Sequence, residues 1–296
     1  MPLCQPGESI DSRHLDRVPF QFRHGFQDHP ALTHQSLVEV LPALPPDQVM
    51  YSSRSDDLAG NLDTAHIDHR NGLSLEETIE NIRTSNSYIA VKRPETHPVF
   101  RELADELTSD IGRLMQERGT GRSPTELELW LFIASPEAVT PFHFDRYSNF
   151  LFQIRGSKEV AVFEPWNSEV IEQVDYEAYV AHEARRMHWH DDKDRFAHKF
   201  HMEPGQAVHI PFLGGHYVKN GKEDVSITMS VFFHNDETTR WSRALLTNHF
   251  LRKRLRPLRV TPRPIRASHG IDSVKAHAYP MIQVVGRGLR RLGLRG

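Results

Sequence analysis

The chain of 296 residues is 38% hydrophobic and 25% charged, a balance that excludes a fibrous or an intrinsically disordered protein. Its length allows two average domains, but barrel folds often use this length as one unit, so we expect one main core. No run of about 18 apolar residues occurs, so we expect no membrane span and predict a cytoplasmic protein. Cys4 is the only cysteine, which excludes an internal disulfide and a cysteine-based zinc cluster. Any bound metal must therefore use His, Asp or Glu.

The net charge of −3 hides an uneven distribution. Residues 252–296 contain 12 of the 36 Lys and Arg residues but only one acid, Asp272, so this tail carries about +11 and the rest of the chain about −14. Such a tail suits nucleic acid, an anionic membrane, or an acidic surface of its own or a partner subunit. A solvated or self-docked terminus is the favoured interpretation, and we expect neither a nucleic-acid nor a membrane partner.

In chain order, residues 13–57 are rich in Pro, His and Gln and weakly periodic, which predicts an irregular leader with a short helix near Leu37. Ser74 and Glu77 have the spacing of a capping box, which predicts a helix over about residues 75–84. A short strand is predicted over residues 88–91, and Pro98 opens a longer helix that ends near Gly119.

After Pro124 the pattern changes to short strand-like runs separated by Gly and Pro, as is typical of a barrel or a sandwich. Residues 169–201 interrupt these runs with an acidic, His-rich insertion that we predict to be partly helical. A final helix is predicted over about residues 237–255, before the basic tail. The predicted strands are 127–133, 148–154, 159–163, 206–210 and 226–233.

His143 and Asp145 lie two residues apart, so on a strand their side chains leave the same face and can approach one ion. Two His and one carboxylate form a facial triad that leaves adjacent positions of an octahedral iron open. His216 is the candidate third ligand, because a strand and the turn Pro211–Gly215 lead into it.

A His-x-Asp pair alone is a weak signal, because the chain contains others without strands on both sides. We interpret these pairs as polar loops, a solvated face or a polar turn rather than as ligands. They begin at His14, His66, His190 and His234.

Three further residues strengthen the assignment of His143, from which they lie at −3, +6 and +15 in the sequence: Thr140, Asn149 and Lys158. A co-substrate such as 2-oxoglutarate has a distal carboxylate that needs a buried cation and a hydroxyl, and a metal-side carboxylate that needs an amide donor. Because Lys158 follows a turn, it could also be a surface lysine. Its spacing from His143, together with the spacings of Thr140 and Asn149, favours a buried role.

Residues 140–165, TPFHFDRYSNFLFQIRGSKEVAVFEP, resemble the central segment of the JmjC-type hydroxylases and cupin-like oxygenases, among them the asparaginyl hydroxylase of hypoxia-inducible factor. Residues 205–220 resemble the second cupin motif. The resemblance implies that His143, Asp145 and His216 bind iron(II). It also implies that Thr140, Lys158 and Tyr88 hold the distal carboxylate of 2-oxoglutarate, and that Asn149 contacts its metal-side end.

The sequence departs from the asparaginyl hydroxylase at three places. Ser230 stands where that enzyme has an asparagine near the cofactor, Ala90 replaces a substrate-contacting glutamine, and the insertion 169–201 has no counterpart. We expect the insertion to lie near the mouth of the barrel, with Trp189 covering part of an amino-acid-like substrate. His209 is expected to support the site from outside the metal shell, or to be an ordinary barrel histidine.

The sequence thus predicts a mainly β double-stranded β-helix, the jelly roll of the cupin/JmjC type, with flanking N- and C-terminal helices. We expect a leader and flank over residues 1–95, a catalytic core over 96–236 that contains the insertion, and C-terminal helices with a basic tail over 237–296. The expected activity is an iron(II)- and 2-oxoglutarate-dependent dioxygenase that uses O2, releases succinate and CO2, and hydroxylates an amino-acid-like, peptide or small-molecule substrate.

Two other functions stay open, a non-catalytic cupin sensor and a cupin enzyme that uses another metal without 2-oxoglutarate. The C-terminal helices resemble the region through which related hydroxylases pair, so we also expect a homodimer.

Overall fold

The computed structural model describes residues 3–55, 57–58, 71–183 and 189–291. The chain divides into two compact units. The first unit comprises Met1–Pro165 and Met187–Asn235, and the second comprises Trp166–Arg186 and Asp236–Gly296. Each unit is described by itself.

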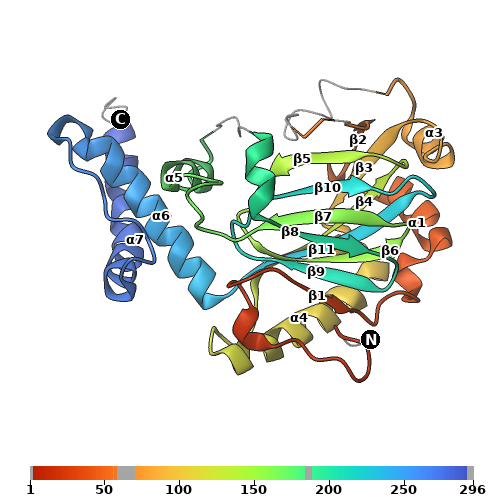
Figure 1. Ribbon diagram of the computed structural model, residues 1–296, viewed down its shortest axis with the longest axis horizontal. Helices are drawn as coiled ribbons and strands as arrows, with labels where there is room; N and C mark the ends of the chain where they lie inside the picture. The colour runs from red at the N-terminus through yellow and green to blue at the C-terminus, as the bar shows by residue number, and fades with distance from the viewer. Residues whose placement is uncertain (1–2, 56, 59–70, 184–188, 292–296) are drawn as a thin grey trace. The chain divides into compact units, whose positions relative to one another are not determined.

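The first unit is built on two β-sheets whose neighbouring strands are all antiparallel over the described residues (Figure 1). The larger sheet has the order β1-β9-β6-β11-β4-β3-β2 and the smaller sheet the order β5-β10-β7-β8. The larger sheet consists of β1 (Phe20–Arg23), β2 (Val49–Ser53), β3 (Ser87–Lys92), β4 (Thr125–Ala134), β6 (Ser148–Arg155), β9 (Gln206–Ile210) and β11 (Ser226–His234). The smaller sheet consists of β5 (Val139–His143), β7 (Lys158–Phe163), β8 (Ala197–Met202) and β10 (His216–Asn220).

The two sheets pack face to face around a small apolar cluster. Leu151, Val208 and Ile210 of the larger sheet contact Val160 and other buried residues of the smaller sheet. Antiparallel sheets packed in this way form a jelly roll. The predicted fold class is therefore confirmed.

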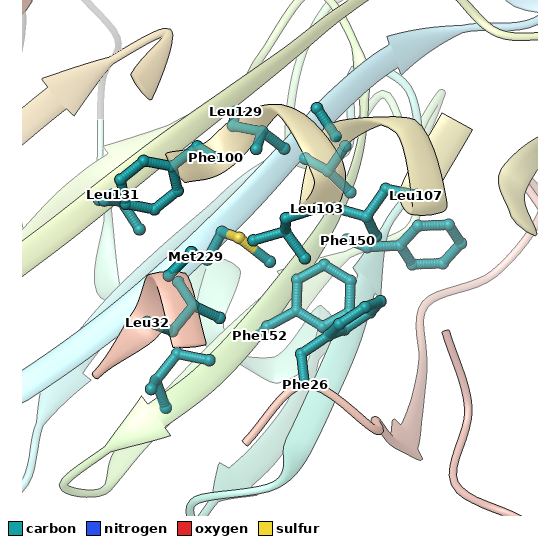
Figure 2. Close-up of a cluster of buried hydrophobic side chains, with 14 of the residues drawn as sticks. Phe26, Leu32, Phe100, Leu103, Leu107, Leu129, Leu131, Phe150, Phe152 and Met229 are labelled. Atoms are coloured by element: carbon teal, nitrogen blue, oxygen red, sulfur yellow. The ribbon is translucent and has the colours of Figure 1, made fainter. Parts of the chain in front are cut away.

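The opposite face of the larger sheet is covered by α4 (Pro98–Arg118) and by the N-terminal segment. Figure 2 shows Phe100, Leu103 and Leu107 of α4 against side chains of the sheet, including Leu129 and Phe152. Since side chains alternate along a strand, the residues between these buried ones point toward the smaller sheet. This alternation determines which residues of β4 and β11 face the smaller sheet.

The first unit also contains α1 (His34–Val40), which confirms the short helix predicted near Leu37, and α3 (Leu75–Glu80). Ser74 and Glu77 form the predicted capping box, but α3 ends four residues earlier than predicted because Asn81 leaves helical geometry. Gly119 ends α4 at φ 74°, a left-handed cap that suits glycine. Short 3-10 helices occur at Ser12–His14, Pro30–Leu32, Leu41–Ala43, Pro46–Gln48, Pro94–Thr96 and Asp191–Phe196.

Sequence-based expectations about the leader and the insertion need correction. The prediction of a leader that is irregular apart from one short helix was wrong, whereas the prediction of a partly helical insertion is confirmed by the helix Gln173–Val180 but was incomplete. The leader is not wholly irregular, because β1 pairs with β9 and β2 pairs with β3. Within the insertion 169–201, residues from Ala197 onward form β8 at the edge of the smaller sheet. Most of β8 is exposed and only Met202 is buried, so an apolar pattern typical of a strand was absent from its sequence.

The second unit contains three helices within its described residues: α5 (Gln173–Val180), α6 (Asp236–Leu255) and α7 (His269–Arg291), with a 3-10 turn at Arg256–Leu258. The fully buried carboxylate of Glu177 accepts hydrogen bonds from Arg252 at 2.7 and 3.0 Å. Lys253 and His249 form ion pairs with Glu183. Part of the basic segment is therefore neutralised by acids of its own unit.

None of the helices in the described part of the chain is long and apolar enough to span a bilayer.

Candidate functional site

His143 and His216 lie opposite each other on neighbouring strands of the smaller sheet. His143 is the last residue of β5 and His216 is the first residue of β10, and the two residues are direct partners in the register. Their ring centroids are 4.1 Å apart, and Nε2 of His216 lies 3.6 Å from Oδ2 of Asp145. One ligand atom from each of these three residues lies within 4.8 Å of the others. Among the described residues they form the one cluster with metal-binding geometry, which we call the triad.

Asp145 reaches the triad by a different route from the one predicted. The strand ends at His143, so Asp145 lies in the following loop and not on the strand. Phe144, between them, is 1% exposed and fixes the loop by packing inward. The expected same-face geometry is thus replaced by a loop anchored through one buried aromatic ring.

Both histidines direct Nε2 toward the centre of the triad. Nδ1 of His143 lies 2.7 Å from the carbonyl oxygen of Pro141, and Nδ1 of His216 lies 3.1 Å from that of Gly214. A carbonyl only accepts hydrogen bonds, so each Nδ1 carries the proton and each Nε2 has a free lone pair. Burial, together with the neighbouring His143, lowers the pKa of His216 well below its usual value. A neutral imidazole with a fixed tautomer is the form that binds a metal.

The donor set fits iron(II). Two imidazole nitrogens and one carboxylate are the donor set of the facial triad found in non-haem iron oxygenases. An ion held by three such ligands would keep coordination positions for further ligands.

Lys158 begins β7 directly after a tight turn. Gly156 in that turn has φ 71°, and a Cβ there would lie 2.4 Å from the Val225 carbonyl oxygen, so the turn requires glycine. Lys158 shares a strand face with Val160 and Val162, which belong to the cluster between the sheets. Its side chain therefore points into the barrel.

The ammonium group of Lys158 is buried and donates a hydrogen bond to Thr228. Burial lowers its pKa from 10.5 to about 7. Over the described residues Lys158 forms no ion pair with a carboxylate. A buried cation without an anion is costly, so this position is suited to an anionic ligand.

Tyr88 and Thr140 connect the two sheets beside the triad. The hydroxyl of Tyr88, on β3, is hydrogen-bonded to the side chain of Thr140, on β5. Burial and the nearby Asp145 carboxylate raise the pKa of Tyr88, so its hydroxyl stays protonated. Two of the residues that the resemblance assigns to the distal carboxylate, Tyr88 and Thr140, are thus in direct contact with each other.

Asn149 is 2% exposed and lies on β6. Its Nδ2 donates to Oγ of Ser230 at 3.2 Å, whereas its Oδ1 is buried and has no hydrogen-bond partner. Ser230, for which the resemblance implies an asparagine in the related enzyme, thus contacts Asn149. An orphaned buried acceptor next to a candidate metal site is an argument for a ligand or water there.

One residue of the site environment was missed from the sequence. Asp16, assigned to a polar loop, is 1% exposed, and its carboxylate accepts hydrogen bonds from Ser148, from the Phe212 amide and from Asn235 at 2.6–2.8 Å. Ser148 follows the Asp145 loop, and Phe212 lies in the turn that precedes His216. Asp16 thus ties together the two segments that carry the triad.

His209 supports the same region. Its Nδ1 donates to the Asn149 carbonyl oxygen at 3.1 Å, and its Nε2 accepts from the Asp16 amide at 3.0 Å. The ring is fully buried, and this burial lowers its pKa. It therefore acts as a neutral link between the leader and β6.

Trp189 does not lie where the sequence suggested. Its ring contacts Phe142, Phe163 and Tyr217 at centroid distances of 5.2, 6.0 and 5.3 Å. Phe163 and Tyr217 alternate with the inward-facing Val162 and His216, so Trp189 covers the outer face of the smaller sheet. The hypothesis that it covers a substrate is wrong.

The remaining His-x-Asp pairs do not form metal clusters within the described residues. His190 is exposed, whereas His234 is buried at the end of β11 rather than in a polar turn. The pair at His66 lies outside the described residues.

Among solved structures, the chain is similar to the X-ray structure of E. coli YcfD, with 16% identity and a TM-score of 0.42 over 93% of this chain and 66% of that chain. A second structure, described as the Escherichia coli ribosomal oxygenase YcfD, gives 16% identity and a TM-score of 0.46 over 92% and 64%. An oxalate decarboxylase structure gives 18% identity and a TM-score of 0.25 over 44% and 28%. The chain spans less than two thirds of the length of these YcfD chains.

No curated protein matches the chain. The family model described as the cupin-like domain matches residues 15–239, which is well over half of the chain. This range includes Asp16, both sheets and the whole triad. The chain therefore belongs to the cupin-like domain family.

Proposed function

We propose that the protein is an iron(II)- and 2-oxoglutarate-dependent oxygenase that hydroxylates an amino-acid-like or peptide substrate. The observation that carries the proposal is the triad of His143, Asp145 and His216 on the same barrel as a buried Lys158, which forms no ion pair with any carboxylate that the structure describes. The first feature suits iron and the second suits a carboxylate that enters the barrel.

Different residues would bind the ion and the distal carboxylate of 2-oxoglutarate. His143, Asp145 and His216 would hold the ion through two neutral nitrogens and one carboxylate oxygen. Lys158 would neutralise the distal carboxylate of 2-oxoglutarate, with the hydroxyls of Tyr88 and Thr140 as further donors. Iron in such a site supplies dioxygen activation coupled to decarboxylation of 2-oxoglutarate to succinate and CO2.

Asn149 would serve the metal-side end of the co-substrate. Its Nδ2 donates one N–H to Ser230 and has a second N–H that could donate to the metal-side carboxylate, whereas its unpartnered Oδ1 is an acceptor that would suit a water. The cluster between the sheets limits water around the buried end of the co-substrate, which strengthens the Lys158 contact.

The two alternative functions explain fewer of these features. A sensor that binds only a metal or a neutral ligand has no need for an uncompensated lysine inside the barrel. An enzyme that binds its metal through three or four histidines needs a histidine where Asp145 stands. The acid at this position and Lys158 together favour 2-oxoglutarate chemistry.

The proposal is tested by metal content and anaerobic calorimetry with 2-oxoglutarate. The full-length protein should bind one iron(II) per chain and then 2-oxoglutarate, and His143→Ala or His216→Ala should lose most of the iron while keeping a cooperative thermal transition. His201→Ala is the matched control, since that side chain is 83% exposed on β8. If both triad variants retain the iron content of the wild type, the triad is misassigned and the proposed function fails.

A further inference from the structure

The face of the larger sheet that points toward the smaller sheet carries aromatic residues that the proposed chemistry does not use. On β4, Trp130 pairs with Ser230 and Phe132 pairs with Thr228 across to β11. Residues directly opposite in a sheet point to the same face. Ser230 binds Asn149 and Thr228 binds Lys158, so Trp130 and Phe132 lie on the face that carries the proposed co-substrate residues.

These aromatic rings form a continuous surface, which we call the aromatic wall: Trp130, Phe132, Tyr147 and Phe232. Centroid distances are 5.9 Å for each of the pairs Trp130–Phe132, Trp130–Phe232 and Tyr147–Phe232. Trp130, Phe132 and Tyr147 are only partly buried, so part of the wall is exposed.

Both ends of the wall adjoin the triad. Phe132 contacts the ring of Tyr88 at 6.1 Å, and Tyr88 is hydrogen-bonded to Thr140, on the same strand as His143. Tyr147, at the other end, follows Asp145 by two residues. A molecule that lies on the wall therefore has one edge beside the triad.

Two opposite charges flank the centre of the wall. Nζ of Lys92 lies 5.1 Å from the centroid of Trp130, which it faces across β3 and β4. Oε2 of Glu128 accepts from the indole Nε1 of the same tryptophan at 3.4 Å. Within the described residues Lys92 and Glu128 do not form an ion pair with each other or with another side chain. Each charge is thus available to a ligand.

We propose that the aromatic wall binds the zwitterionic head of a free α-amino acid, with its carboxylate at Lys92 and its ammonium at Glu128. The side chain of the amino acid then crosses the wall toward the triad. This inference rests on the proposed function and names the substrate class. A residue inside a peptide carries neither head-group charge, so it matches neither Lys92 nor Glu128.

The proposed contacts with Lys92 and Glu128 predict that capping either charged group of the amino acid weakens its binding. A hydrogen bond to a charged partner contributes roughly 1.5–3 kcal/mol, so N-acetylation or amidation should weaken binding by about tenfold or more. The aromatic faces contribute to both the free and the capped compound, because their contact with the side chain is unchanged.

The experiment measures binding of the proteinogenic L-amino acids and of their N-acetyl and amide forms to the full chain. The protein is loaded with iron(II) and 2-oxoglutarate under argon, and tryptophan fluorescence and calorimetry report binding. At least one free amino acid should bind, and both of its capped forms should bind about tenfold more weakly or worse. Trp130→Phe should remove the fluorescence response, whereas Trp189→Phe, on the outer face of the smaller sheet, should keep it.

Charge variants separate the two ends of the head group. Lys92→Met should weaken binding of the free amino acid but not binding of its amide, which has no carboxylate. Glu128→Gln should weaken binding of the free amino acid but not binding of its N-acetyl form, which has no ammonium group. Lys222→Met and Glu223→Gln are the matched controls, because these side chains are 78% and 82% exposed. Both controls should bind like the wild type.

Equal binding of free and capped compounds, or no binding of any free amino acid at millimolar concentration, overturns the inference and points to a peptide substrate. In the same samples 2-oxoglutarate binding is measured before any amino acid is added. Intact 2-oxoglutarate binding confines such a failure to the substrate class, whereas its loss overturns the proposed function and this inference together.

Discussion

Lys158 is the residue whose placement has the largest energetic consequence. Burial lowers its pKa from 10.5 to about 7, which corresponds to roughly 5 kcal/mol of unfavourable free energy for the charged form. The unfolded chain takes up this proton below pH 10.5, whereas the folded chain does so only below about 7. Folding stability therefore falls as the pH is lowered through this window, and the full penalty is present below about pH 7.

This residue should show opposite effects on stability and on function. Lys158→Met keeps the length of the side chain and removes the charge, so the free energy of unfolding of the ligand-free protein should rise by about 1–4 kcal/mol at pH 6. The dissociation constant for 2-oxoglutarate should rise at least about a hundredfold, since the ligand loses its buried partner. Urea unfolding and calorimetry measure the two effects, with Lys222→Met as the exposed control.

The pH dependence of 2-oxoglutarate binding gives an independent check. Binding of an anion requires protonated Lys158, so the affinity should fall as the pH rises above about 7. An affinity that is constant from pH 6 to 9, or a Lys158→Met protein with wild-type affinity, would contradict the role of Lys158.

At the residue scale, the sequence predicted which site residues come together when those residues are close in the chain. His143 and Asp145 are close because only Phe144 separates them, and the strand pairing of β5 with β10 places His216 beside them. Asp16 was missed because its burial depends on Ser148, Phe212 and Asn235, all more than 100 residues away. No local pattern around Asp16 reveals such contacts.

At the scale of elements, long periodic segments were predicted and short edge strands were not. The helix that opens at Pro98 has a repeating apolar face, and α4 follows it. By contrast, β1 has four residues and β8 is mostly exposed, so neither has the alternation that predicts a strand. Their place in the sheets is decided by pairing with β9 and β7 rather than by their own sequence.

Asp16, which links the leader to the two segments that carry the triad, can be tested by substitution. Asp16→Ala removes three hydrogen bonds to a buried carboxylate, including those donated by Ser148 and Asn235. The free energy of unfolding should fall by about 2–4 kcal/mol, and iron should bind more weakly because the turn before His216 loses its anchor. Asp28→Ala, at an exposed position, is the control. Wild-type stability and iron affinity in Asp16→Ala would show that the leader does not position the triad.

At the scale of the whole molecule, the basic character of the C-terminal region has a partly local explanation. Arg252 and Lys253 pair with Glu177 and Glu183 of the same unit. These acids belong to the segment that the sequence presented as an insertion into the barrel. The charge asymmetry along the chain therefore reflects, in part, a helical unit assembled from two separate segments.

The second unit also presents apolar side chains that its own helices do not cover. On α7, Val274, Met281 and Val284 are 70%, 72% and 64% exposed, and their spacing of seven and three residues places them on one face of the helix. Exposed apolar stripes of this kind are typical of surfaces that pair with another protein. The predicted homodimer would bury this stripe against its copy in a partner subunit.

The double variant Val274→Asp, Met281→Asp should therefore be monomeric, because two like charges would face each other across a two-fold interface without compensation. Light scattering at micromolar protein concentration measures the mass, and circular dichroism shows whether the helices are retained. Gln283→Asp, exposed on the same helix but outside the stripe, should remain dimeric and controls for added charge alone. A monomeric wild type, or a folded double variant that is still dimeric, would show that this stripe does not mediate pairing. If the wild type is a dimer and the double variant is a monomer, both proteins should bind metal and 2-oxoglutarate equally, since all seven proposed site residues lie in the first unit.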